Sequence, residues 1–270
     1  RGTATLSNAT VTATTTGTGN CYTLLSDKSG KFTINSGTYS AVATGSATDV
    51  YAIYASNATV TATVNGGRFS GKSKEMSKTA GTFTLKGGYY VHNTDLAANC
   101  AANYHVLPLT GEDPYLYEVA EAYTVTFNAN GHGTSPDAQV IKKDGTATEP
   151  SALSETGYLF GGWYTEAGCT NAWSFATAVT ANTTLYAKWT EAVASVTVGS
   201  ATTYYATLPE AFTFASGASS APTITILNDV SGITSALIYS GTKNCTLDLN
   251  GHTVAGDATH LIQMAPTTNT

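Results

Sequence analysis

Apolar and polar positions recur in an eight-residue block, four times in the first hundred residues and once near the C-terminus. In each copy the second residue is aliphatic, the seventh is apolar, and the residues between them are mostly polar or glycine. The second residues are Leu6, Ile34, Val64, Leu85 and Leu249, and the seventh residues are Val11, Tyr39, Phe69, Tyr90 and Val254. Because side chains alternate between the two faces of a strand, both sets are predicted to form ladders inside one core.

The spacing of the blocks predicts how the strands stack. The four N-terminal blocks start 28, 30 and 21 residues apart, and a second apolar strand follows at residues 21–26, 50–55 and 260–265. Such intervals are typical of stacked repeats. Strand, turn, strand and return predict an all-β fold built of parallel, right-handed β-helix coils about 4.8 Å apart. An antiparallel sandwich of short strands is the alternative.

The blocks in the two end regions are in register with each other. Counting from Asp248 to the C-terminus and on to Thr5, as if two copies met there, gives 27 residues. We therefore expect a neighbouring copy to continue the β-helix across a junction. The residues at this junction would be Arg1, Gly2, Thr3, Thr268, Asn269 and Thr270. A covalent excerpt of a longer repeating chain, a cleaved subunit and separate subunits docked head to tail all remain open.

Aromatic motifs change the pattern between residues 123 and 189. They are Tyr-x-Val-x-Phe-x-Ala-Asn-Gly from Tyr123, Gly-Tyr-x-Phe-Gly-Gly-Trp-Tyr-Thr-Glu from Gly157, Trp-Ser-Phe from Trp173 and Thr-Leu-Tyr-Ala-Lys-Trp ending at Trp189. Together they closely resemble the Listeria–Bacteroides repeat, the B-repeat of internalin B and of many bacterial surface proteins. The resemblance implies a small β-grasp-like module outside a bacterial cell, usually in tandem and without enzymatic activity. The aromatic side chains are interpreted as a compact core, with an exposed sugar-stacking platform as the alternative.

A second set of coils is predicted after the module. Thr207, Pro209 and Glu210 predict a helix start with Thr207 as N-cap, and such a helix would cover the unpaired edge of a first coil. Residues 223–230 and 245–254 resemble the opening coils of pectate-lyase-like β-helices, a superfold that leaves function open. The predicted domains are residues 1–122 (coils with a closing segment), 123–190 (the B-repeat module) and 191–270 (the start of a β-helix with its capping helix).

Composition and charge remove several classes of function. Charged residues make up 11% of the chain and the net charge is −6, with Lys and Arg scattered singly, so nucleic acid is not an expected partner. No apolar run is long enough to span a membrane. The four cysteines match no metal spacing, and Asp248 has no second acid in a neighbouring coil. We therefore expect no catalytic residues, no metal site and no cofactor.

These patterns favour a non-enzymatic structural or adhesive protein of the bacterial cell surface. Its expected partners are further copies of the same repeat, head to tail, and host or bacterial surface glycans or proteins. The chain starts at Arg1 without a start methionine or secretion signal, so we expect an excerpt or a processed product. A carbohydrate-binding or polysaccharide-degrading β-helix is the alternative. An ice-binding array on the threonine column Thr5, Thr33, Thr63 and Thr84 is a minor one.

Overall fold

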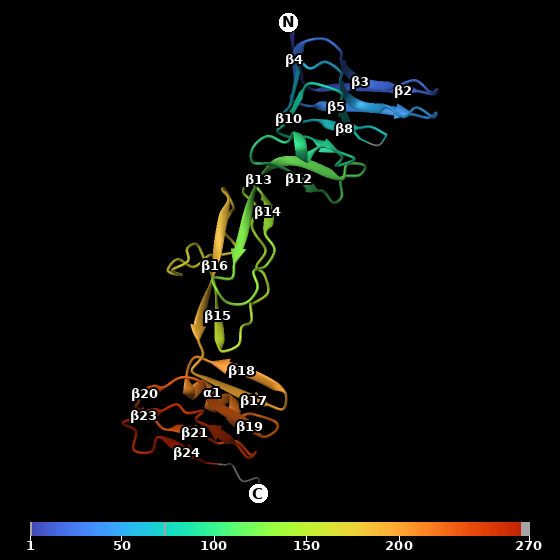
Figure 1. Ribbon diagram of the computed structural model, residues 1–270. Coiled ribbons are helices and arrows are strands. Elements are labelled where there is room, and N and C mark those ends of the chain that lie inside the picture. The colour runs from blue at the N-terminus through green and yellow to red at the C-terminus, as the bar shows by residue number, and fades with distance from the viewer. Residues whose placement is uncertain (1, 73, 266–270) are drawn as a thin grey trace. The chain divides into compact units, whose positions relative to one another are not determined.

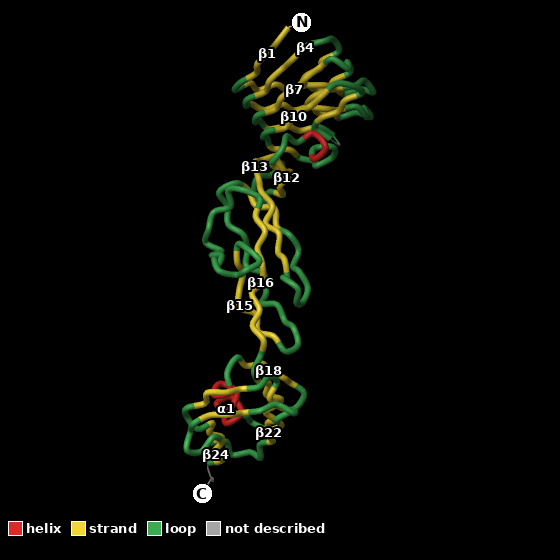
Figure 2. Tube along the Cα trace, turned by 60° about the vertical axis from the view of Figure 1, so that its left-hand side comes forward, coloured by secondary structure: helices red, strands yellow, loops and turns green. Residues whose placement is uncertain are grey.

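The computed structural model describes residues 2–72 and 74–265, and the prediction of an all-β fold is confirmed (Figures 1 and 2). The chain divides into two compact units. One contains the residues up to 125 together with 138–147 and 176–183; the other contains 126–137, 148–175 and the residues from 184 on. Residues 123–190 contribute to both units, so the three predicted domains remain an interpretation of the sequence.

Three parallel sheets form the first part of the N-terminal unit. The first contains β1 (Gly2–Leu6), β4 (Gly30–Ile34), β7 (Val60–Val64) and β10 (Thr82–Leu85), which lie side by side in Figure 2. The second contains β2 (Ala9–Thr15), β5 (Gly37–Ala43), β8 (Arg68–Ser70) and β11 (Tyr89–Tyr90), and the third contains β3 (Cys21–Ser26), β6 (Val50–Ala55) and β9 (Met76–Lys78). The chain visits the sheets in this order on each round. We call each round, β1–β3, β4–β6 and β7–β9, a layer.

Antiparallel strands end this stack of layers. After β11 the chain passes through a short 3-10 helix, Ala97–Asn99, where Leu96 is fully buried and the Ala101 N–H donates to the Leu85 carbonyl at 2.9 Å. The strand β13 (Tyr117–Asn128) then pairs antiparallel with β11 and with β12 (Tyr104–Pro108). The sheets are therefore open and one of them is mixed, rather than a uniform stack of parallel coils.

The stretch with aromatic motifs forms two antiparallel strand pairs. In the first unit β13 pairs with β14 (Gln139–Lys142), and in the second unit β15 (Tyr158–Tyr164) pairs with β16 (Thr183–Glu191). A bulge interrupts β15 between Phe160 and Trp163. The ring of Trp163 meets Phe127 edge-on at 4.9 Å, and Trp189 meets Phe160 at 5.6 Å. Edge-to-face rings at these distances are the packing of a small aromatic core.

The C-terminal part of the second unit contains two further layers. β19 (Pro222–Ile226), β20 (Val230–Ile233) and β21 (Leu237–Tyr239) pair in parallel with β22 (Thr246–Asp248), β23 (Val254–Gly256) and β24 (Ile262–Met264), respectively. On the other side of β19 lie the antiparallel strands β17 (Ala194–Val198) and β18 (Ala201–Tyr205).

The predicted helix is α1 (Leu208–Ser216), and its start is confirmed. The Glu210 N–H donates to the hydroxyl of the N-cap Thr207, and that hydroxyl donates to the Glu210 carboxylate at 2.8 Å. Three buried residues of the helix, Leu208, Ala211 and Phe212, belong to the same apolar core as Ile224 and Ile226 of β19. The helix therefore packs on the layer β19–β21.

Candidate functional site

Two interior ladders run through the layers of the first unit. Leu6, Ile34, Val64 and Leu85 are successive partners in the first sheet, and Val11, Tyr39, Phe69 and Tyr90 are successive partners in the second. All of these are fully buried except Leu6 and Val11, which are half-buried. The rings of Tyr39, Phe69 and Tyr90 stack at 5.3 and 5.2 Å. The two half-buried residues are the ones in the first layer, β1–β3.

The fifth copy of the block lies in the other unit and is less buried. Leu249 is 43% exposed and follows β22, while Val254 is half-buried and pairs with Val230. The expected interior position of Leu249 is not reached within one chain, because no later layer among the described residues lies over it. Its turn also differs: positive φ falls on Asn250 and Gly251, whereas the blocks at residues 33, 63 and 84 place it on Gly37, Gly67 and Gly88.

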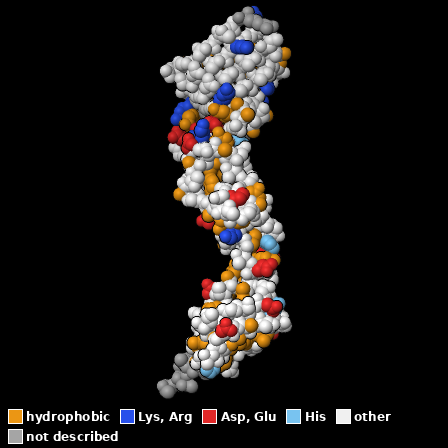
Figure 3. All heavy atoms as spheres, turned by 90° about the vertical axis from the view of Figure 1, so that its left-hand side faces the viewer, with side chains coloured by type: hydrophobic (Ala, Val, Ile, Leu, Met, Phe, Trp, Pro, Cys, Tyr) orange, Lys and Arg blue, Asp and Glu red, His pale blue; other side chains and the backbone are white. Residues whose placement is uncertain are grey.

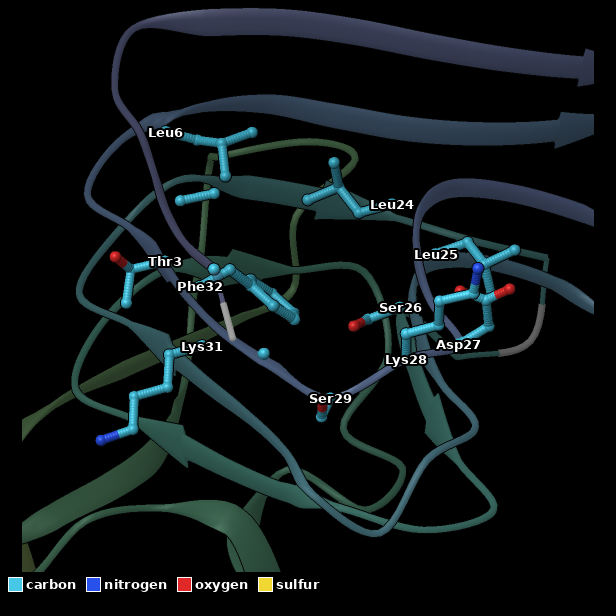
Figure 4. Close-up of a pocket in the computed structure, with 13 residues that line it drawn as sticks. Thr3, Leu6, Leu24, Leu25, Ser26, Asp27, Lys28, Ser29, Lys31 and Phe32 are labelled. Carbon is cyan, nitrogen blue, oxygen red and sulfur yellow. The ribbon is translucent and has the colours of Figure 1, made fainter.

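A cavity opens at the end of the stack formed by the first layer (Figure 4). It has a volume of about 520 Å³ and is lined by residues of β1, β3 and β4 and by the turn between the last two strands. Leu6, Leu24 and Phe32 supply its apolar surface, and Ser26 and Ser29 lie along its side. The cavity is therefore the part of the apolar interior that lies at the first layer, where no further described layer covers it.

The predicted junction residues are only partly described. Gly2 and Thr3 lie in β1, pair with Gly30 and Lys31, and are exposed. Arg1, Thr268, Asn269 and Thr270 lie outside the described residues. The junction therefore remains a prediction.

The threonine column exists but is not a uniform array. Thr5, Thr33, Thr63 and Thr84 form one row on the first sheet. In the row two residues before it, Lys31 stands between Thr3 and Thr61. A lysine in this position breaks the flat Thr-x-Thr surface that an ice-binding face would need.

One buried acid was not singled out from the sequence. Glu75 is fully buried, and its Oε1 accepts from the His92 backbone N–H at 3.1 Å and contacts the His92 Nδ1 at 2.8 Å. Burial raises the pKa of Glu75, and the contacts with His92 lower it by less. No motif spacing joins residues 75 and 92, since the contact depends on how the chain folds between β9 and the segment after β11.

The remaining titratable groups that the structure describes lie scattered. Within the described ranges no group of three or more His, Cys, Asp or Glu is arranged to hold a metal ion. Cys21, Cys100, Cys169 and Cys245 are free thiols. Asp229 lies 3.4 Å from His252, and the Thr253 N–H is the main cause of its lowered pKa. Charged side chains are also sparse over much of the face drawn in Figure 3.

Comparison with known proteins assigns the central stretch to a family. Residues 123–188 match the model of the Listeria-Bacteroides repeat domain, as the motifs from Tyr123 to Trp189 predicted. The match does not extend to the flanking layers, so their resemblance to pectate-lyase-like β-helices has no support from it.

Two proteins of Evansella cellulosilytica share similar sequence. One, named "Putative Gly-rich membrane protein", is 45% identical over 69 residues, which are 25% of this chain and 8% of that protein. The other, named "Putative membrane protein", is 40% identical over 82 residues, 29% of this chain and 12% of that protein. The matched stretch thus spans about a tenth of the length of these relatives. In the part of the chain that the structure describes, no helix is both long and apolar enough to cross a membrane.

Proposed function

We propose that this chain is a non-enzymatic structural or adhesive repeat protein of the bacterial cell surface. The observation that carries the proposal is the combination of a Listeria-Bacteroides repeat at residues 123–188 with stacked parallel layers in each unit. The names of the two relatives, both described as membrane proteins, favour a place in the cell envelope. Such a protein would extend from the cell surface and present many copies of the same binding surface, and this role requires no deep catalytic pocket.

The layers are best explained as coils of a parallel, right-handed β-helix. The chain returns to the same three sheets in the same order, and each return adds one parallel strand to each sheet. One such layer cannot bury its apolar face alone, so stacking of layers is the source of the core. The fully buried rows at Ile34 and Val64 and at Tyr39 and Phe69 have this origin.

The proposed partners are further copies of the same repeat, so that one chain is one period of an extended fibre. Host or bacterial surface glycans or proteins are the proposed targets of an adhesive role. Repetition of weak sites along a fibre raises the effective concentration of each site, which gives avidity without a deep pocket in any single copy.

The location is tested by antibody labelling of intact cells of the bacterium that encodes the chain. An antibody raised against the 270-residue chain is expected to label intact cells, and brief protease treatment of these cells is expected to remove the signal. A cytoplasmic protein of the same cells is the control for leakage. Labelling that appears only after the cells are permeabilised would overturn a surface role.

A further inference from the structure

Among residues 2–72 and 74–265, each stack of layers is covered at one end, and no described residue covers the other end. In the first unit the helical turn Ala97–Asn99 and the strands β12 and β13 cover the end at β10 and β11. In the second unit α1 and β17 cover the layer β19–β21. The uncovered ends are therefore the layer β1–β3, which we call the entry face, and the layer β22–β24, which we call the exit face.

Apolar side chains on both faces are more exposed than their partners in the next layer. On the exit face Ile262 and Met264 are 37% and 55% exposed, although their partners Leu237 and Tyr239 in the layer behind are buried. On the entry face Leu6 and Val11 are half-buried, while their partners Ile34 and Tyr39 are fully buried. A side chain inside a stack packs against both neighbouring layers. On each face one of these neighbours is absent among the described residues.

We infer that the exit face of a second copy docks on the entry face and fills its cavity, which continues the three parallel sheets from one copy into the next. The inference rests on the proposed fibre and names the surfaces that would build it. Leu249 of the second copy would lie against Leu6, Leu247 against Ala4, and Val254 against Val11. Ile262 and Met264 would approach the side of the cavity that Leu24 lines.

The internal spacing of the two faces supports this pairing. Val254 follows Leu249 by five positions, and Val11 follows Leu6 by five positions. The same separation joins Ile34 to Tyr39 and Val64 to Phe69, which already stack on each other inside the first unit. Because the two positions are equally far apart in both layers, Leu249 can meet Leu6 while Val254 meets Val11. The buried layers of the first unit stack in the same way.

The direction of the strands favours docking of unlike faces. A parallel sheet continues only if the added strand runs in the same direction, as the exit face of a second copy would provide. If two identical entry faces were placed opposite each other, the order β1, β2, β3 would run clockwise on one face and anticlockwise on the other. One strand could then lie against the same strand of the other copy. Each of the other two strands would lie against a strand of a different sheet. The contact is therefore heterologous, which builds a chain of copies rather than a closed pair.

The test uses charged substitutions at positions that are exposed in a single chain. Ala4→Asp alters the entry face, and Leu249→Asp alters the exit face; both side chains are exposed, so the fold of the separate chain should tolerate the change. Val42→Asp is the control, because Val42 is 41% exposed on β5 in the second layer, does not line the cavity and is not in either ladder. Circular dichroism and thermal melts confirm that each variant is folded.

Sedimentation velocity of the full chain over a range of concentrations gives the readout. The unmodified chain and Val42→Asp are expected to form oligomers that lengthen with concentration. Ala4→Asp and Leu249→Asp should each weaken self-association at least about tenfold, because an unpaired charge would be buried at the contact. A mixture of these two variants should form a dimer and nothing larger, since only one intact exit face meets one intact entry face.

Other results would overturn the inference. Dimers of Leu249→Asp alone would show that two entry faces bind each other. Oligomers of the unmodified chain that all three variants leave unchanged, or a monomer at the highest concentration, would show that these faces do not dock. Labelling of intact cells is measured independently, so a surface location can stand even where this contact fails.

Discussion

Glu75 shows how much one residue depends on contacts far from it in sequence. Its carboxylate is fully buried and is bound on one side by His92, while Oε2 has no hydrogen-bond partner among the described residues. An unpaired buried carboxylate oxygen is costly when the group is charged. Burial therefore raises the pKa of Glu75 above its ordinary value of 4.5 despite the contacts with His92.

This raised pKa predicts a pH dependence of stability. The folded chain holds the Glu75 proton more tightly than the unfolded chain does. The free energy of unfolding should therefore fall as the pH rises from about 4.5 through the folded-state pKa. Glu75→Gln should remove that part of the slope and should be at least as stable as the unmodified chain at pH 7. Urea unfolding at several pH values measures the effect, with the exposed Glu149→Gln as the control. An unchanged slope in Glu75→Gln would contradict it.

Local patterns predicted individual elements better than the contacts between them. The interior rows and the start of α1 depend on alternation and on residues within four positions of one another, which the sequence displays directly. The contacts of Arg68 do not depend on such local patterns. Its guanidinium lies 4.8 Å from the centre of the Tyr89 ring and 5.0 Å from that of the Tyr115 ring. It also lies 3.0 Å from the Glu112 carboxylate. Loops of unequal length decide where these groups meet.

The aromatic ladder gives a graded prediction at the scale of elements. Phe69 is fully buried between the rings of Tyr39 and Tyr90, whereas Val11 at the start of the same row is half-buried. Phe69→Ala should lower the free energy of unfolding by about 3–5 kcal/mol, and Val11→Ala by less than about 1.5 kcal/mol. Denaturant unfolding of the two variants tests this order. Equal losses would mean that Val11 is already covered in the separate chain.

At the scale of the whole chain, the sequence motifs identified the repeat but not the two compact units. The motifs from Tyr123 to Trp189 located the family match closely, because each motif is a short run of neighbouring residues that the sequence shows directly. The structure nevertheless divides this stretch between two compact units. A motif indicates which residues form a module, whereas the grouping of contacts depends on how β13 and its partners pack.

The two units have separate apolar cores, which predicts two unfolding transitions. Ile34 is fully buried in the core of the first unit and Ile226 in that of the second, and the two cores share no residue. Ile34→Ala and Ile226→Ala should each cost about 2–5 kcal/mol, and each should shift a different transition in a calorimetric melt. Because the sites share no partner, the double variant should show both shifts with nearly additive size. If either single substitution moved both transitions equally, the two cores would have to unfold as one cooperative unit.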